Sequence, residues 1–300
     1  MAEARKSFLD SAVLGRLMAL PLHARHAMLG NVSGKHRSPV RGSSLEFAQY
    51  RKYVPGDDIR RLDWRTWGRS DRFYIKEFEA DTNLRICLLI DTSGSMGFGP
   101  TGSTRLDYAR RLAGALAYLA SNQGDAVGLR SLAEKPVEIP TRRGPIHLGI
   151  VLDQMAGIKP LGGTTLLTAL HDAAENIRQR ALVVILSDFF VPPAELKSAI
   201  EHLRFQRHDV AAFHLLDQKE IDFAFDQPAH FLDMEGGEGV MADPSLIATN
   251  YRTAVRLYLA EMDELVRNTS MDYHRVKLHE PYEAVLVRFL LGRSPKQASR

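Results

Sequence analysis

The sequence has little cysteine, little net charge and no long apolar run. Its only cysteine, Cys87, cannot form an intrachain disulfide, so a disulfide-stapled scaffold is excluded and a reducing compartment is indicated. No apolar run reaches the length of a membrane-spanning helix, and Arg16 splits the apolar stretch 12–22 that a signal peptide would need to be continuous. We therefore expect a cytoplasmic protein. A formal net charge of +3 is too small to indicate nucleic-acid binding by itself.

The 300 residues are enough for one large or two small domains with an ample core. Short apolar runs typical of buried strands alternate with segments that repeat apolar residues at helical spacing. The expected strands cover residues 84–90, 126–132, 181–187, 210–216 and 271–278, and the expected helices cover 105–122, 146–155, 166–177, 192–205, 244–267 and 282–291. This alternation predicts an α/β fold: an open, mostly parallel sheet with helices on both faces and a short antiparallel edge at 136–139.

One stretch, residues 84–96, combines a buried strand with a cluster of oxygen-bearing side chains. Its apolar run ends abruptly in Asp91-Thr-Ser93-Gly-Ser95. Because residues two apart point the same way in an extended turn, Asp91, Ser93 and Ser95 can converge on one point. Gly94 lets the backbone bend between the two hydroxyls. A carboxylate and two hydroxyls at the carboxyl end of a buried strand suit Mg²⁺, which prefers oxygen ligands.

The Asp-x-Ser-x-Ser string after an apolar strand resembles the metal-ion-dependent adhesion site of von Willebrand factor A domains. That resemblance implies two further ligands, a threonine from a second loop and an aspartate at the end of a later strand. The candidates are Thr164, in a Gly-Gly-Thr-Thr loop, and Asp188, which directly follows the apolar run 181–187. The alternative is that Asp91 and Asp188 cap helices while the serines and the threonine hold turns. We favour the metal site, because caps do not require two buried strands to end in acids at one sheet edge.

A second resemblance precedes the metal-site strand. The segment 50–79 contains a Tyr-x-Pro-Gly-Asp-Asp turn, then Arg-x-x-Asp-Trp, then Lys-x-Phe-Glu. Together with residues 36–42, these motifs are similar to those of the bacterial domain-of-unknown-function 58 family. The residues that carry the likeness are Tyr53, Pro55, Gly56, Asp57, Asp58, Arg60, Asp63, Trp64, Lys76, Phe78 and Glu79.

The two resemblances together imply three parts of the chain. Residues 1–82 are expected to form a family-specific N-terminal α+β segment that packs on the next domain. Residues 83–292 are expected to form a von Willebrand factor A-like (Rossmann-like) domain. Residues 293–300 are expected to be a frayed polar tail.

Residues 35–72 are locally basic and hold several aromatic side chains, a combination that can bind single-stranded nucleic acid. Acidic residues are interleaved throughout the segment, so we favour a subdomain held by packed rings and surface ion pairs. Nucleic-acid binding through 35–72 stays open as an alternative. Steep salt dependence that survives the substitution Asp91→Ala would reveal it.

The predicted metal ligands are Asp91, Ser93, Ser95, Thr164 and Asp188. Together they supply two negative charges and three neutral hydroxyls, and Mg²⁺ keeps some waters, so not all five need bind directly. A cation held mainly by neutral ligands keeps positive charge and favours a carboxylate from a partner as its last ligand. The resembled A domains are thought to bind in this way. The expected ion is Mg²⁺, with Mn²⁺ or Ca²⁺ as substitutes.

The resemblance to the second family also implies a partner. Its members are often encoded beside MoxR-type AAA+ ATPases and are thought to act with them in chaperone-like assembly or remodelling. We therefore expect a non-catalytic protein-binding module. A Mg²⁺-dependent hydrolase that uses a metal-bound water is the alternative.

Overall fold

The structure is a computed structural model that describes residues 8–23, 46–54, 63, 66–68, 73–79, 84–100, 102–133, 135–161, 166–225, 227, 229–231, 234–236 and 239–293. The chain divides into two compact units, Ala24–Leu84 and a larger unit formed by Met1–His23 with Arg85–Arg300. This division differs from the expected N-terminal segment 1–82, because the first residues of the chain belong to the larger unit.

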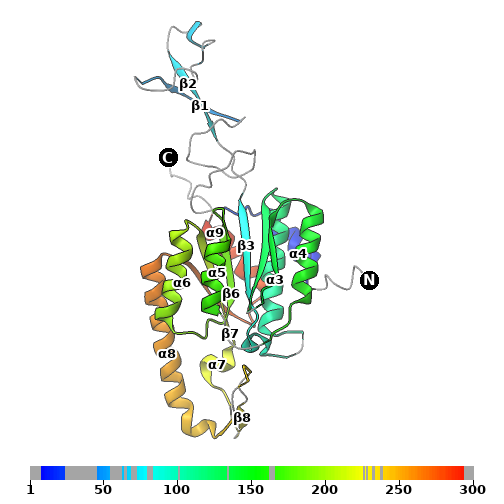
Figure 1. Ribbon diagram of the computed structural model, residues 1–300, viewed down its shortest axis with the longest axis vertical. Helices are drawn as coiled ribbons and strands as arrows, with labels where there is room; N and C mark the ends of the chain where they lie inside the picture. Colours follow the sequence, from blue (N-terminus) through cyan, green and yellow to red (C-terminus); the bar gives the residue numbers. More distant parts are fainter. Residues whose placement is uncertain are drawn as a thin grey trace. The chain divides into compact units, whose positions relative to one another are not determined.

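In the described part of the chain, the larger unit is built on a six-stranded sheet (Figure 1). Its strands in spatial order are β10 (Asp272–Lys277), β7 (Asp209–Leu216), β6 (Leu182–Ser187), β3 (Arg85–Asp91), β4 (Ala126–Leu132) and β5 (Glu138–Arg142). Neighbouring strands pair in parallel, except that β5 pairs antiparallel with β4. Numbered along the chain within this sheet, the order from the β5 edge is 3-2-1-4-5-6, which is that of a doubly wound fold.

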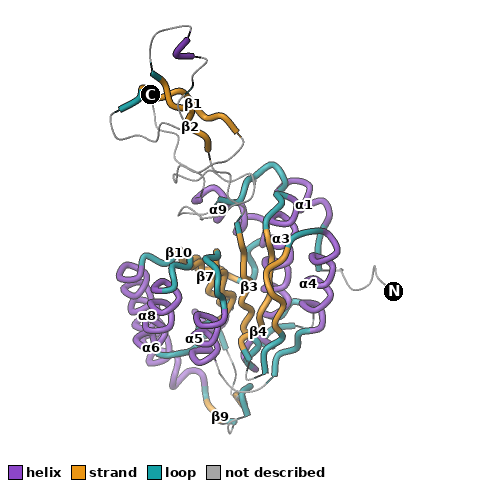
Figure 2. The backbone as a smooth tube through the Cα atoms, turned by 45° about the horizontal axis from the view of Figure 1, so that its top comes forward, coloured by secondary structure: helices purple, strands orange, loops and turns teal. Residues whose placement is uncertain are grey.

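Helices cover both faces of this sheet (Figure 2). One layer contains α1 (Ser11–Leu17), α3 (Arg105–Asn122), α4 (Pro145–Gly157) and α9 (Tyr282–Arg293), and the other contains α5 (Leu166–Asn176), α6 (Pro193–Phe205) and α8 (Pro244–Thr269). The predicted fold class, an open and mostly parallel sheet with helices on both faces, is therefore confirmed.

Shorter elements lie between β7 and α8 along the chain. They are α7 (Gln218–Asp222) and an antiparallel hairpin of β8 (Ala229–Phe231) with β9 (Val240–Ala242). Within the described residues, no helix combines the length and the apolar character that crossing a bilayer requires.

The central strand β3 is buried on both faces. Every residue from Ile86 to Asp91 is buried. Cys87 and Leu89 pack in a core cluster with the helices α5, α6 and α8, and the side chains that alternate with them point to the opposite face of the sheet. Burial on both faces explains why this strand is a continuous apolar run in the sequence rather than an alternating one.

α1 belongs to the larger unit because its apolar face packs there. Val13, Leu14 and Leu17 are buried, and the helix contacts α3 and α9. Arg16 also places its guanidinium 2.6 Å from the carboxylate of Glu283 on α9. These contacts join distant parts of the chain and leave no local signal in the sequence, so the expected and observed boundaries differ.

The expected frayed tail, 293–300, begins one residue too early. Arg293 is the last residue of α9 and is only 4% exposed. Its guanidinium lies 2.8 Å from Asp209 and 3.0 Å from Asp272, at the amino ends of β7 and β10. The rest of the predicted tail, 294–300, lies outside the described residues.

The smaller unit contains an antiparallel pair, β1 (Glu46–Lys52) with β2 (Tyr74–Glu79). Asp63 is 5% exposed, and its carboxylate accepts hydrogen bonds from the Thr66 backbone N–H at 3.3 Å and the Thr66 hydroxyl at 3.0 Å. The Trp67 and Phe73 rings stack with centroids 5.8 Å apart. The aspartate of the Asp-Trp motif therefore caps a short turn, whereas Trp64 lies outside the described residues.

Candidate metal centre

The sheet changes its direction of winding between β3 and β6. From β3 the chain adds β4 and β5 on one side, and then β6, β7 and β10 on the other. Asp91 is the last residue of β3 and Asp188 directly follows β6, so both acids lie at the carboxyl edge of two adjacent parallel strands. Doubly wound folds bind ligands in the crevice at this switch point.

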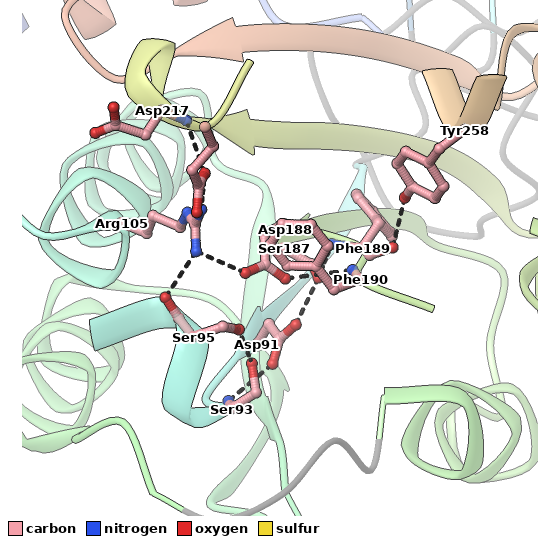
Figure 3. A network of polar contacts seen from close by, with 11 residues as sticks. Asp91, Ser93, Ser95, Arg105, Ser187, Asp188, Phe189, Phe190, Asp217 and Tyr258 are labelled. Carbon is pink, nitrogen blue, oxygen red and sulfur yellow. Dashed lines mark hydrogen bonds and ion pairs between the residues drawn. The ribbon is translucent and has the colours of Figure 1, made fainter. Parts of the chain in front are cut away.

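Two hydrogen bonds fix the Asp91 carboxylate (Figure 3). The Ser93 backbone N–H donates to Oδ1 at 2.9 Å, and the Ser187 hydroxyl donates to Oδ2 at 2.5 Å. Asp91 is 2% exposed. Because a carboxylate oxygen has two lone pairs, each oxygen can still accept one further ligand.

The two predicted serines meet beside Asp91. The Ser93 and Ser95 hydroxyl oxygens lie 3.0 Å apart. The turn that brings them together is not the extended turn expected from the sequence. It is the 3₁₀ turn η3 (Gly94–Gly97), in which the Met96 N–H donates to the Ser93 carbonyl at 3.1 Å. The prediction that the hydroxyls converge therefore agrees with the geometry, although the expected backbone conformation was wrong.

Gly94 allows a loop to pack directly on the η3 turn. A Cβ at this position would lie 1.9 Å from the carbonyl oxygen of Met234. Real Cβ atoms do not make contacts that short, so any side chain at Gly94 must displace the loop 234–236. The glycine is required here by close approach of another backbone.

Arg105 is a buried cation that pairs with Asp188. It is 1% exposed. Its Nη1 donates to Asp188 Oδ2 and to the Ser95 carbonyl oxygen, both at 2.9 Å, and its Nη2 pairs with the carboxylate of Glu220 on α7. Arg105 therefore joins the η3 turn, the end of β6 and α7 in one network (Figure 3).

Burial disfavours the ionised forms of both acids, and repulsion from Asp188 adds to the effect at Asp91. Burial, followed by the negative charge of Asp188, raises the pKa of Asp91 to about 6, although the hydrogen bonds from Ser187 and Ser93 oppose the rise. Burial also raises the pKa of Asp188, against the opposing charge of Arg105. A divalent cation beside both acids would favour their ionised forms, so the electrostatics of this sheet edge fit a cation.

The donor atoms also fit a hard cation. Asp91, Asp188, Ser93 and Ser95 offer only oxygen, which suits Mg²⁺ better than metals that prefer nitrogen or sulfur. Within the described residues, no group of three or more His, Cys, Asp or Glu side chains is placed to hold a metal ion. An ion at this edge would therefore depend on the serine hydroxyls.

The fifth predicted ligand, Thr164, lies outside the described residues. The chain just before it is held at the edge of the sheet, because the Leu161 N–H donates to the Thr92 carbonyl at 2.8 Å. The start of the predicted threonine loop is thus next to the end of β3. The role of Thr164 stays a prediction.

Residues 49–259 match the family described as protein of unknown function DUF58. The chain belongs to this family. A relative is Rv1480, an uncharacterised protein of Mycobacterium tuberculosis, which is 27% identical over 290 residues that cover 95% of this chain and 90% of the relative.

Two solved structures from Bacteroides are similar at low identity. An aerotolerance-related membrane protein of Bacteroides fragilis, with multiple mutations to serine, is 15% identical, with 69% of this chain and 96% of that chain covered and a TM-score of 0.44. BatB, a conserved hypothetical protein of Bacteroides thetaiotaomicron, is 17% identical, with 70% and 98% covered and a TM-score of 0.43.

Three members of the polar network in this DUF58 protein were missed in the sequence: Ser187, Arg105 and Glu220. Ser187 ends the same apolar run that identified Asp188, so a hydroxyl at the strand end was an available signal. Arg105 also had a signal, because it stands one helical turn before the buried Ala109 on an apolar face. Glu220 had no such signal in the sequence, because α7 is only five residues long and shows no helical repeat of apolar residues.

Proposed function

We propose that the larger unit is a non-catalytic, Mg²⁺-dependent protein-binding module. The observation that carries this proposal is the convergence of Asp91, Ser93, Ser95 and Asp188 at the switch point of the sheet. The donor chemistry supports Mg²⁺, with Mn²⁺ or Ca²⁺ as substitutes. The Asp-x-Ser-x-Ser motif supports a binding role of the kind implied by the von Willebrand factor A resemblance.

The charges around the proposed centre favour an acidic ligand. Asp91 and Asp188 are the only two anionic donors among the proposed ligands, and Arg105 already pairs with Asp188 at 2.9 Å. Among its ligands, an ion bound here would share Asp188 with Arg105 and have only Asp91 to itself, so it would keep positive charge. A carboxylate from a partner protein is the group that would satisfy that charge best.

The hydroxyls of the site support binding rather than nucleophilic catalysis. Ser187 donates to Asp91, and Ser93 and Ser95 bond each other. No histidine bonds any of these hydroxyls in the described part of the chain, so none of them has the imidazole base of a serine hydrolase. Mg²⁺-dependent hydrolysis that is abolished by Asp188→Ala would contradict a purely binding role.

The partner class that the family resemblance implies is a MoxR-type AAA+ ATPase, in chaperone-like assembly or remodelling. Such a partner would place the module in the cytoplasm. The test is capture of the ATPase from the native host with the tagged chain as bait, in Mg²⁺, in chelator, and with Asp91→Ala. The matched control is Asp153→Ala, which removes an exposed acid of α4.

We expect the ATPase to be retained in Mg²⁺ by the unmodified chain and by Asp153→Ala, and to be lost in chelator and with Asp91→Ala. Circular dichroism establishes that both variants are folded. Equal retention in all conditions would show that the partner does not use this site.

A further inference from the structure

An apolar pocket lies beside the proposed metal centre. It has a volume of about 220 Å³ and is walled mainly by side chains of the loop after β6, α7 and α8. Its apolar walls include Phe190, Leu216, Ile221, Tyr251, Val255 and Tyr258. Phe190 is 49% exposed although it is a large aromatic side chain, so the rim of the pocket presents hydrocarbon to the surroundings.

The pocket shares its wall with the metal centre. Phe190 follows Asp188 by two residues, and its ring centroid lies 5.4 Å from the guanidinium carbon of Arg105. Glu220 lines the pocket and also pairs with Arg105. Tyr258 fixes α8 against the same loop by donating its hydroxyl to the Phe189 carbonyl at 2.5 Å (Figure 3). A ligand group at Asp188 is therefore adjacent to the pocket.

A second hollow, the basic groove, continues from the apolar pocket. It has a volume of about 940 Å³ and shares Leu216, Ile221 and Leu259 with the pocket. Its rim carries the cations Arg275, Lys277 and Arg288. The groove starts at the ends of β7 and β10, which lie at the same carboxyl edge of the parallel sheet as Asp91.

The cations of the groove outnumber the carboxylates that pair with them. Arg275 lies 2.7 Å from Asp263 and Arg288 lies 2.7 Å from Glu280. Lys277 is exposed and makes no ion pair with a carboxylate in the described part of the chain. The groove therefore has charge to offer an acidic ligand.

We propose that the metal centre, the apolar pocket and the basic groove dock one extended acidic segment of a partner protein. A carboxylate of the segment reaches the metal centre, the next large apolar side chain enters the pocket, and further acidic residues lie on the groove. The first contact rests on the proposed function. The pocket and the groove add the specificity, because a carboxylate alone would not distinguish one acidic protein from another.

The test begins with random twelve-residue peptides displayed on phage and panned on the full chain in Mg²⁺. Enriched sequences are synthesised with a fluorophore, and their dissociation constants are measured by anisotropy. We expect enriched peptides to combine an acidic residue with a large apolar residue and a second acid within a few positions. An enriched pool with no such combination would overturn the proposal.

Two variants and one control test the surface itself. Ala254→Trp fills the pocket from the exposed face of α8, and Ala260→Trp places the same side chain on that helix away from the pocket. We expect Ala254→Trp to raise the dissociation constant about tenfold or more, because an apolar side chain loses its site. Lys277→Glu should raise it several-fold and reduce its salt dependence, while Ala260→Trp should leave it unchanged.

The outcomes separate this proposal from the proposed function. Peptides that need Mg²⁺ and Asp91 but bind Ala254→Trp as tightly as the unmodified chain would overturn the docking surface alone. The dissociation constants could instead be the same in Mg²⁺, in chelator and with Asp91→Ala, but rise with Ala254→Trp. That result would show that the segment binds the pocket without contacting the metal. Self-association in sedimentation that Ala254→Trp abolishes would identify a second copy as the occupant and overturn the partner segment.

Discussion

Arg105 and Asp188 form an ion pair that is almost completely removed from solvent. Arg105 Nη1 and Asp188 Oδ2 lie 2.9 Å apart, and the two side chains are 1% and 2% exposed. Arg105 also pairs with Glu220, so one cation pairs with two acids, and a third acid, the buried Asp91, lies next to them. The carboxyl edge of the sheet therefore keeps an excess of negative charge, which is the condition under which a cation binds there.

Loss of Arg105 should strongly destabilise the fold. Arg105→Met leaves Asp188 and Glu220 without their cation, and breaking a buried ion pair in this way costs about 3–5 kcal/mol. Urea unfolding measures the change in the free energy of unfolding. Arg111→Met is the control on the same helix, because its guanidinium bonds the Gly102 carbonyl at the surface and should contribute about 0.5 kcal/mol or less. Equal losses for the two variants would contradict the role of the buried pair.

Asp91→Asn should stabilise the metal-free protein. The substitution removes a buried negative charge that repels Asp188, and asparagine can keep both hydrogen-bond partners, Ser93 and Ser187. We expect the free energy of unfolding in chelator at neutral pH to rise by about 1 kcal/mol or more, since burial of uncompensated charge is costly. The same measurement would count against the electrostatic argument if Asp91→Asn were less stable than the unmodified chain in chelator.

The same substitution at two glycines should have opposite effects. Gly94→Ala forces the backbone at Met234 to move, because the new Cβ would lie 1.9 Å from its carbonyl oxygen. Overpacking of this kind costs about 1–3 kcal/mol. Gly149 lies in α4, and apart from its chain neighbours and the adjacent backbone of its own helix no heavy atom lies within 4 Å of the Cβ position. Gly149→Ala should therefore stabilise by about 0.5–1 kcal/mol through helix propensity. Thermal unfolding of both variants checks the signs, and a neutral Gly94→Ala would show that the loop does not pack there.

Stability should fall with rising pH because of Cys87. Burial raises the pKa of its thiol to about 12, whereas an exposed thiol ionises near 8.5 (about the model-peptide value). Above that pH the unfolded chain loses its proton first, so the free energy of unfolding drops by up to about 1.4 kcal/mol per pH unit until the folded thiol also ionises. Urea unfolding at several pH values between 8 and 10 should show this slope in the unmodified chain and a smaller one in Cys87→Ala. Equal slopes in the two proteins would show that folding does not raise the pKa of the Cys87 thiol.

The sheet and its main helices were predictable because their signals are local. β4 has the predicted bounds, and α3 begins at Arg105 and ends at Asn122 as expected. Parallel strands place their carboxyl ends at one edge, so the approach of Asp91 and Asp188 followed from two apolar runs that end in acids. The 3₁₀ conformation of η3 did not follow, because Gly94 tolerates several backbone conformations and the contact with Met234 decides among them.

Other features could not be predicted because they depend on distant partners. The burial of Arg105 requires Glu220, which is 115 residues further along the chain, and no local pattern connects the two. In the sequence Arg293 is the first residue of a polar run, and only the tertiary structure places Asp209 and Asp272 beside it. α1 carries a clear apolar face, but only the tertiary structure shows that α3 and α9 cover it.

The most direct test of a cation site at Asp91 and Asp188 is a calorimetric titration of Mg²⁺ into the metal-free chain, its Asp91→Asn variant and the control Asp153→Asn. We expect one binding event in the unmodified chain and in Asp153→Asn, and none in Asp91→Asn, which stays folded by circular dichroism. Repeating the titration with Mn²⁺ would report the same site with a second hard ion. Equal heats in all three proteins, or no binding in the unmodified chain, would contradict the metal centre and with it the proposed function.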